Sequence, residues 1–184
     1  GYNWRMPTII AALGISQLGK FDKIIKLRQE HANYFNKRLE KHSEIKTPIP
    51  PEGYDHIYQM YSIRLSNKQI RDSLKDFLLK KRIFCKIYFN PIHLTEYYKS
   101  RIGSKEGDLP ITEKISEQLL TLPLFPGMTV EEKSFLCDSI DEFFDNVIVN
   151  DEDKTIQKNR LELLQMLRKT FDNYLNFSTI EIIK

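Results

Sequence analysis

The 184-residue sequence has only two cysteines, no long apolar run and no marked excess of either charge. Cys85 and Cys137 provide neither a disulfide framework nor the paired spacing of a zinc site, and both stand among apolar residues, where a buried thiol is expected. No apolar run approaches the roughly 20 residues that a membrane-spanning helix needs. No basic-then-apolar leader opens the sequence. We therefore expect a cytoplasmic protein with no metal site and no membrane segment.

Charge gives little support to nucleic acid as a partner. The 28 basic and 25 acidic side chains leave a net charge of only +3. The two signs alternate along an expected helix, at Lys20, Asp22, Lys23, Lys26, Arg28 and Glu30. This alternation is typical of a solvated helix face rather than of a surface that follows a phosphate backbone. We expect no nucleic-acid partner.

The residues that are present can form a globular core. Hydrophobic residues make up 41% of the chain and charged residues 29%, and the aromatic set comprises 11 Phe, 9 Tyr and one Trp. Residues 7–42 predict one long helix that begins near Pro7 and bends between Gly19 and Asp22. Its expected buried stripe is Ile10, Leu13, Leu18, Phe21, Ile25, Ala32, Phe35 and Leu39. Small residues in its first turns (Ala11, Ala12, Gly14 and Ser16) permit close approach of another backbone, such as that of a second subunit.

The residues after this helix alternate between strand and helix patterns. Strands are predicted at 56–65, 83–89 and 122–125, and helices at 66–82 and 110–120. A further helix is expected to begin at a capping box formed by Thr129 and Glu132, and another capping box is expected at Ser66 and Gln69. The fold class is therefore α/β of the α+β kind: a long kinked helix, then a small, mostly antiparallel sheet with helices packed on it. Residues 1–149 form one domain, and residues 150–184 read as a polar linker followed by an amphipathic helix at about 156–175.

Three segments, in order, resemble the DegT/StrS-type nucleotide-sugar aminotransferases, a branch of the aspartate-aminotransferase fold. The opening GYNWRMPTIIAALGISQL resembles that family's Gly-(Tyr/Phe)-Asn-x-Arg-Met segment. IFCKIYFNPIHLTEYYK resembles its stretch that ends in Pro-x-His, and LTLPLFPGMTVEEKSFLCDSI resembles its closing Leu-Pro segment. The resemblance covers residues 1 to about 147. It implies that 1–149 is the small C-terminal domain of a type I aminotransferase with its linking helix.

The resemblance implies pyridoxal phosphate as cofactor. In that family a lysine of the large domain forms a Schiff base with the cofactor, an acidic residue holds the pyridine nitrogen protonated, and an aromatic ring stacks on the pyridine. These residues precede the Gly-x-Asn-x-Arg-Met segment, which here is residues 1–6. None of the 19 lysines stands in a matching context, so we expect no catalytic residue and no complete cofactor site in this chain.

The resemblance also implies four binding residues. Asn3 matches the position whose amide reaches the cofactor phosphate of the neighbouring subunit, although a helix-cap or turn role is the alternative. Arg5 has a planar donor set suited to a carboxylate or phosphate of the substrate, or to a structural salt bridge. Tyr88 and His93 flank the loop that resembles the substrate loop, where His93 is as readily a loop-stabilising residue. His56 is expected to be structural.

The function implied by the resemblance is amino transfer from glutamate to a keto-sugar nucleotide, in the synthesis of surface glycans or other amino sugars. The chain would then contribute substrate-binding residues and the interface of a homodimer. A truncated or remnant domain that only mediates protein association is the alternative, favoured by the missing lysine. A small nucleic-acid binder that stacks bases on Tyr88 and Phe89 is the least favoured, because the sequence has no basic groove and no aromatic-glycine motif.

Overall fold

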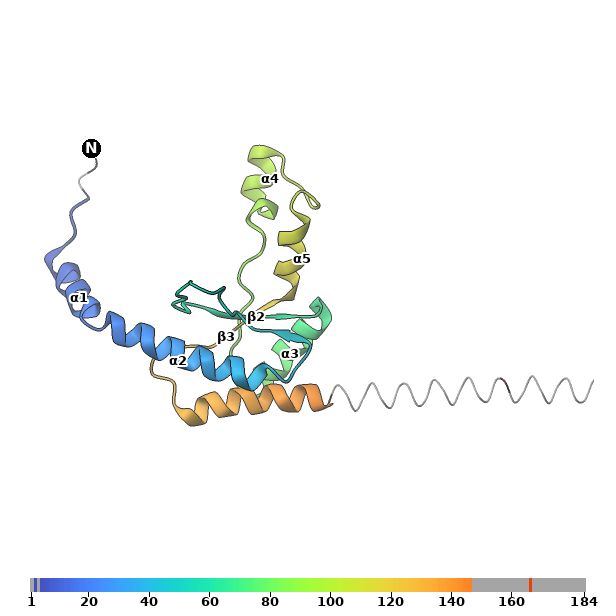
Figure 1. The fold of residues 1–184 in the computed structure, drawn as a ribbon. Coiled ribbons are helices and arrows are strands. Elements are labelled where there is room, and N and C mark those ends of the chain that lie inside the picture. Colours follow the sequence, from blue (N-terminus) through green and yellow to red (C-terminus); the bar gives the residue numbers. More distant parts are fainter. Residues whose placement is uncertain (1, 3, 147–165, 167–184) are drawn as a thin grey trace, which may run out of the picture. The chain divides into compact units, whose positions relative to one another are not determined.

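The computed structural model describes residues 2, 4–146 and 166, in two compact units, residues 1–141 and 142–184. The elements along the first unit are α1, α2, β1, β2, α3, the short 3₁₀ helix η1, α4, α5 and β3 (Figure 1). A last helix begins at residue 130 and continues to residue 146, where the described stretch ends. The expected linker and the helix at 156–175 lie outside the described residues, apart from Met166.

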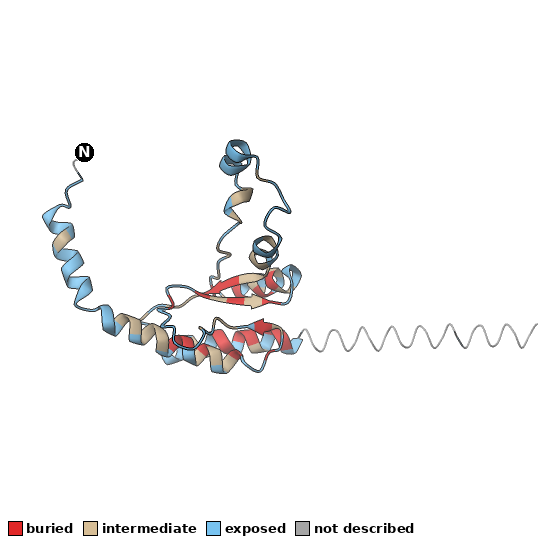
Figure 2. Cartoon of the chain, turned by 45° about the horizontal axis from the view of Figure 1, so that its top comes forward, coloured by how far each residue is buried: buried red, intermediate tan, exposed pale blue. Residues whose placement is uncertain are grey.

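The long N-terminal helix is broken, as expected, at Gly19. Helix α1 spans Thr8–Leu18 and α2 spans Phe21–Leu39, with two non-helical residues between them. The predicted stripe is correct only for α2, where Ala32, Phe35 and Leu39 are buried. The prediction is wrong for its first four members: Ile10, Leu13 and Leu18 lie on α1, which buries no residue, and Phe21 at the start of α2 is exposed. Figure 2 shows α1 coloured as exposed along nearly its whole length.

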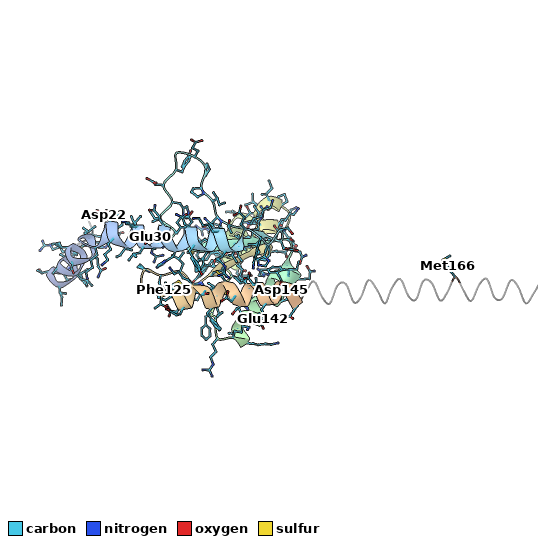
Figure 3. All side chains as sticks on the ribbon, turned by 60° about the horizontal axis from the view of Figure 1, so that its bottom comes forward. Asp22, Glu30, Phe125, Glu142, Asp145 and Met166 are labelled. Atoms are coloured by element: carbon cyan, nitrogen blue, oxygen red, sulfur yellow. The ribbon has the colours of Figure 1, made fainter. Side chains whose placement is uncertain are left out.

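The charged face expected on this helix is confirmed. Lys20, Lys23 and Lys26 are exposed, as are Asp22 and Glu30, which Figure 3 labels on α2. Arg28 differs, because its side chain is half-buried and hydrogen-bonded to the loop before β2.

The sheet has three antiparallel strands in the order β1–β2–β3. Strand β2 spans Tyr61–Leu65 and pairs with β1 (Ile45–Lys46) and with β3 (Leu119–Leu122). The strand expected at 56–65 is therefore shorter, since Tyr58 has a φ of 47°, which interrupts extended backbone. Strand β1 was not expected.

Two other strand predictions need correction. Residues 83–89 form no strand: they make one isolated bridge, between Lys86 and Thr121, beside β3. Strand β3 lies at 119–122 rather than at 122–125, because Pro123 has no N–H with which to extend the ladder.

Four helical elements, α3, η1, α4 and α5, follow one another between β2 and β3 in sequence. Helix α3 spans Lys68–Lys80 and buries Leu74 and Leu78, and α5 spans Pro110–Gln118. The cap of α3 is Asn67, whose Oδ1 accepts from the Ile70 N–H, rather than the expected Ser66, whose hydroxyl donates to the Glu44 carbonyl. Between them lie η1 (Ile92–Leu94) and α4 (Glu96–Ile102).

The capping box at the last helix is confirmed. The Glu132 side chain accepts from the Thr129 N–H at 2.9 Å, and the Thr129 hydroxyl accepts from the Glu132 N–H at 3.2 Å. Leu136 and Ile140 of this helix are buried as expected, whereas Phe135 is exposed.

Helix α2 and residues 130–141 lie side by side. Nη2 of Arg38 on α2 forms ion pairs with Asp138 at 2.6 Å and with Asp141 at 3.0 Å.

Candidate substrate-side site

The four residues expected in the site lie in different places. Asn3 lies outside the described residues. Arg5 is exposed in the segment before α1, and it has no ion pair or hydrogen bond within the described part of the chain. Tyr88 and His93 lie five positions apart in the segment that joins α3 to α4. Only this last pair is thus brought into one local structure.

Tyr88 lines a cavity of about 250 Å³ beside β2 and β3. Polar and apolar groups share its wall, which is formed by Gln59, Met60, Tyr61, Phe84, Lys86, Tyr88, Thr121, Leu122, Pro123 and Leu124. The Lys86 ammonium lies 5.6 Å from the centroid of the Tyr88 ring, within cation–π range. A cavity with an aromatic face, an amide and a cation suits a polar ligand that carries a ring or an anionic group.

Arg28 connects two segments that line this Tyr88 cavity. Its Nη1 donates to the carbonyls of Tyr58 and Gln59 at 2.8 and 3.1 Å and lies 3.5 Å from the Leu124 carbonyl. The segment before β2 is thereby tied to the segment after β3. These partners stand 30 to 96 positions away in sequence, which is why no local pattern indicated the role of Arg28.

Near Tyr88 in sequence, a second cavity of about 510 Å³ is bordered by Ile87, Asn90, Pro91 and Leu94. Arg71 of α3 is its most buried charged side chain and donates through Nε to Asp72 at 2.7 Å. Basic and acidic residues are equally represented in the wall, which comprises Lys68, Arg71, Ile87, Asn90, Pro91, Leu94, Glu106, Pro110, Glu113, Lys114, Ser116 and Glu117. Tyr88 and His93 therefore do not share a cavity: Tyr88 faces the smaller one and His93 lines neither.

His93 is bound to Glu113 of α5. Its Nε2 lies 2.8 Å from the Glu113 Oε1, and the two side chains are only 11% and 17% exposed. Glu113 also accepts from the N–H groups of Gly107 and Leu109. The His93 hydrogen bond and then the Gly107 hydrogen bond lower the pKa of Glu113, so this carboxylate stays ionised. No sequence pattern indicated this role of Glu113, because its partners His93, Gly107 and Leu109 approach it only in the folded chain.

His56 is placed as expected of a structural residue. Its Nδ1 accepts from the Tyr58 N–H at 3.0 Å and its ring contacts the Tyr58 ring at 4.4 Å between centroids.

Burial raises the pKa of both cysteine thiols, Cys85 and Cys137, to about 12, which makes them poor nucleophiles at neutral pH.

Neither these two cavities nor a third combines the groups of a pyridoxal phosphate site. Such a site needs a lysine, a carboxylate for the pyridine nitrogen and an aromatic ring in one cavity. The Tyr88 cavity has a lysine and aromatic rings but no carboxylate in its wall. The larger cavity, and a third of about 200 Å³ at Ser43, Glu44 and Lys46, have lysines and carboxylates but no aromatic ring.

Similarity to known proteins decides the family. The profile of the DegT/DnrJ/EryC1/StrS aminotransferase family matches residues 1–141, which include both cavities and the His93–Glu113 pair. The chain belongs to this family. GDP-perosamine synthase from Escherichia coli O157:H7 is 31% identical over 144 residues, which cover 78% of this chain and 38% of that protein. A pleiotropic regulatory protein from Geobacillus stearothermophilus is 32% identical over 147 residues, with the same two coverages.

Solved structures of this aminotransferase family share the fold. A family member from Brucella abortus is 29% identical, with a TM-score of 0.68 over 78% of this chain and 37% of its own. PseC from Helicobacter pylori, an aminotransferase of pseudoaminic acid biosynthesis, has a TM-score of 0.72 at 21% identity, over 79% and 39% of the two chains. The chain thus spans less than two fifths of the length of these relatives.

A second profile, the DALR anticodon binding domain, matches residues 126–184. Most of that range lies outside the described residues.

No helix in the described part of the chain is both long and apolar enough to span a bilayer. Nor do three or more His, Cys, Asp or Glu side chains converge in metal-binding geometry within that part.

Proposed function

We propose that this chain provides the substrate-binding side of a pyridoxal-phosphate-dependent aminotransferase that transfers an amino group from glutamate to a keto-sugar nucleotide, for surface-glycan or amino-sugar synthesis. The observation that carries the proposal is the match of residues 1–141 to the aminotransferase family. GDP-perosamine synthase and a spore coat polysaccharide biosynthesis protein among the relatives favour a sugar nucleotide as the substrate.

Within the proposal, the Tyr88 cavity receives part of the sugar nucleotide. The ring of Tyr88 offers a stacking face, and Lys86 and Gln59 offer donors for hydroxyl or phosphate oxygens. Arg5, outside both cavities, is proposed to meet a carboxylate or phosphate group when the substrate is bound. We propose that this chain holds only part of the cofactor site, with Asn3 donating to the cofactor phosphate of a neighbouring subunit.

A homodimer is part of the proposal. Helix α1 has large apolar side chains on all its faces and buries none of them: Ile9, Ile10, Leu13, Ile15 and Leu18 are all at least half exposed. Such a surface is normally covered by another chain or domain. The Cβ position of Gly14 in this helix has no other atom within 4 Å, which leaves room for a neighbouring backbone.

The alternative suggested by the DALR match is an anticodon-binding tail. Charge does not favour it, since the matched residues 126–184 contain seven basic and twelve acidic side chains and so have no net attraction for a phosphate backbone. A role in protein association alone is the other alternative, and the cavity at Tyr88 favours ligand binding over it.

The test is calorimetric titration of the chain with a sugar nucleotide, GDP-mannose. We expect saturable binding that Tyr88→Ala weakens about tenfold, which corresponds to ~1.4 kcal/mol. Tyr97→Ala is the matched control: Tyr97 is an exposed tyrosine of α4 that lines neither cavity. Binding that is absent, or that both variants leave unchanged, contradicts the proposal.

A further inference from the structure

Glu113 occupies a position where three segments meet. It lies in the first turns of α5, and its carboxylate reaches η1 through His93 and the loop at 103–109 through two backbone N–H groups. Gly107, one of these donors, has a φ of 93°, a backbone conformation that residues other than glycine rarely adopt. The Ser104 hydroxyl also donates to the His93 carbonyl, so this loop is bound to η1 twice.

The Glu113 carboxylate accepts from three donors. Gly107 N lies 3.0 Å from Oε1 and 2.9 Å from Oε2, Leu109 N lies 3.2 Å from Oε1, and His93 Nε2 lies 2.8 Å from Oε1. An ionised carboxylate has no hydrogen to donate. The hydrogen of the His93 contact must therefore be on Nε2.

This assignment leaves the other ring nitrogen for a ligand. In a neutral imidazole with the hydrogen on Nε2, Nδ1 carries a lone pair and accepts a hydrogen bond. Nδ1 of His93 has no partner within the described part of the chain. The ring cannot rotate to present the other nitrogen without breaking its contact with Glu113.

We propose that Glu113 is the positioning residue for His93: it fixes the Nε2–H tautomer, so that Nδ1 of His93 is an acceptor for a hydroxyl group of the sugar nucleotide. This inference rests on the proposed function for its ligand, whereas the tautomer itself is independent of that function. A hydroxyl is the chemical class that fits, because a lone pair on Nδ1 attracts a donor and repels a phosphate oxygen.

The test is nitrogen NMR of the chain labelled at its four histidines, compared between the wild type, Glu113→Gln and Glu117→Gln. A glutamine at 113 has no charge, and its NH₂ group, which cannot accept, must face either the Gly107 N–H or Nε2 of His93. We expect His93 to be the Nε2–H tautomer in the wild type and to change tautomer in Glu113→Gln. Glu117 lies one turn further along α5, pairs with Lys68 and does not touch His93, so Glu117→Gln is expected to retain the wild-type spectrum.

The second arm is titration of the same three proteins with GDP-mannose. We expect the His93 Nδ1 signal to move on binding, and the affinity to fall at least tenfold in Glu113→Gln and to stay unchanged in Glu117→Gln. If Glu113→Gln does not fold, Glu113→Asp, which retains the charge on a shorter side chain, is expected to show the same loss of the single tautomer.

A wild-type ring with a hydrogen on Nδ1, either as the other tautomer or as the doubly protonated ring, or a tautomer that Glu113→Gln leaves unchanged, would overturn the positioning role. GDP-mannose binding with no change at Nδ1, or with equal affinity in Glu113→Gln, overturns the ligand contact and leaves the proposed function standing. Absence of GDP-mannose binding to all three proteins overturns the proposed function and the ligand contact together, while the tautomer comparison still decides the role of Glu113.

Discussion

Replacement of Arg28 by methionine measures how much its hydrogen bonds contribute to the free energy of unfolding. Methionine keeps most of the aliphatic side chain and removes the guanidinium. Nη1 carries two hydrogens, so of its three carbonyl neighbours the two at 2.8 and 3.1 Å are the substantial hydrogen bonds, and the one at 3.5 Å is marginal. A hydrogen bond from a charged donor contributes about 1.5–3 kcal/mol when buried, but Arg28 is only half-buried. We expect a total loss of about 2–3 kcal/mol.

The assay is thermal and denaturant unfolding of Arg28→Met beside a control, Lys26→Met. At this chain length 1 kcal/mol shifts the melting temperature by roughly 2–4 °C, so we expect Arg28→Met to melt roughly 5–10 °C lower than the wild type. Lys26 is exposed on the same helix and has no hydrogen bond or ion pair within the described part of the chain, so its replacement is expected to change the free energy of unfolding by less than about 0.5 kcal/mol. Equal stability of the two variants would refute the reasoning that Arg28 ties the two loops together.

Four further predictions concern the cofactor, the interface and pH. The chain alone is expected to form no covalent lysine adduct with pyridoxal phosphate, since none of its 19 lysines stands in the context of the family's Schiff-base lysine: a stable absorption band near roughly 410–430 nm, fixed by borohydride at one lysine, would contradict this. Light scattering is expected to show a dimer, or dye binding to exposed apolar surface if the chain is monomeric; a clean monomer that binds no dye would refute the interface at α1. In a full-length enzyme, Asn3→Ala is expected to weaken cofactor binding roughly ten- to a hundredfold, the equivalent of about 1.5–3 kcal/mol, with the melting temperature of the cofactor-free protein unchanged; a lower melting temperature with unchanged affinity would instead indicate a capping role. Arg38 lowers the pKa of Asp138, so the carboxylate stabilises the fold above its unfolded pKa of about 3.9 and loses that contribution as pH falls through the lower folded pKa; the difference in melting temperature between wild type and Asp138→Asn is expected to shrink below about pH 4, and a constant difference would contradict it.

Elements set by local chemistry were predictable from the sequence. The Thr129–Glu132 capping box needs only four consecutive positions, and both of its hydrogen bonds are present. The break at Gly19 and the start of α5 at Pro110 likewise follow from single residues with strong backbone preferences. The antiparallel sheet followed from the short separations between strands.

Features that depend on distant partners were not predictable. The apolar periodicity of α1 suits burial, but no part of the described chain covers it, so a stripe that looked internal is exposed. Residues 83–89 have strand-forming side chains, yet they pair with β3 at a single bridge, between Lys86 and Thr121. Arg28 and Glu113 bind groups that only the folded chain brings near, and neither belongs to a motif.

The central claim, that this chain supplies the substrate side of a sugar aminotransferase, is tested most directly by a chimera. Residues 1–141 would replace the matching segment of GDP-perosamine synthase, to which the chain is 31% identical over 144 residues. We predict that the purified chimera binds cofactor and transfers an amino group from glutamate to the substrate of that enzyme, and that Tyr88→Ala in the chimera reduces kcat/KM at least tenfold while Tyr97→Ala does not. A folded chimera loaded with cofactor that transfers no amino group would contradict the claim.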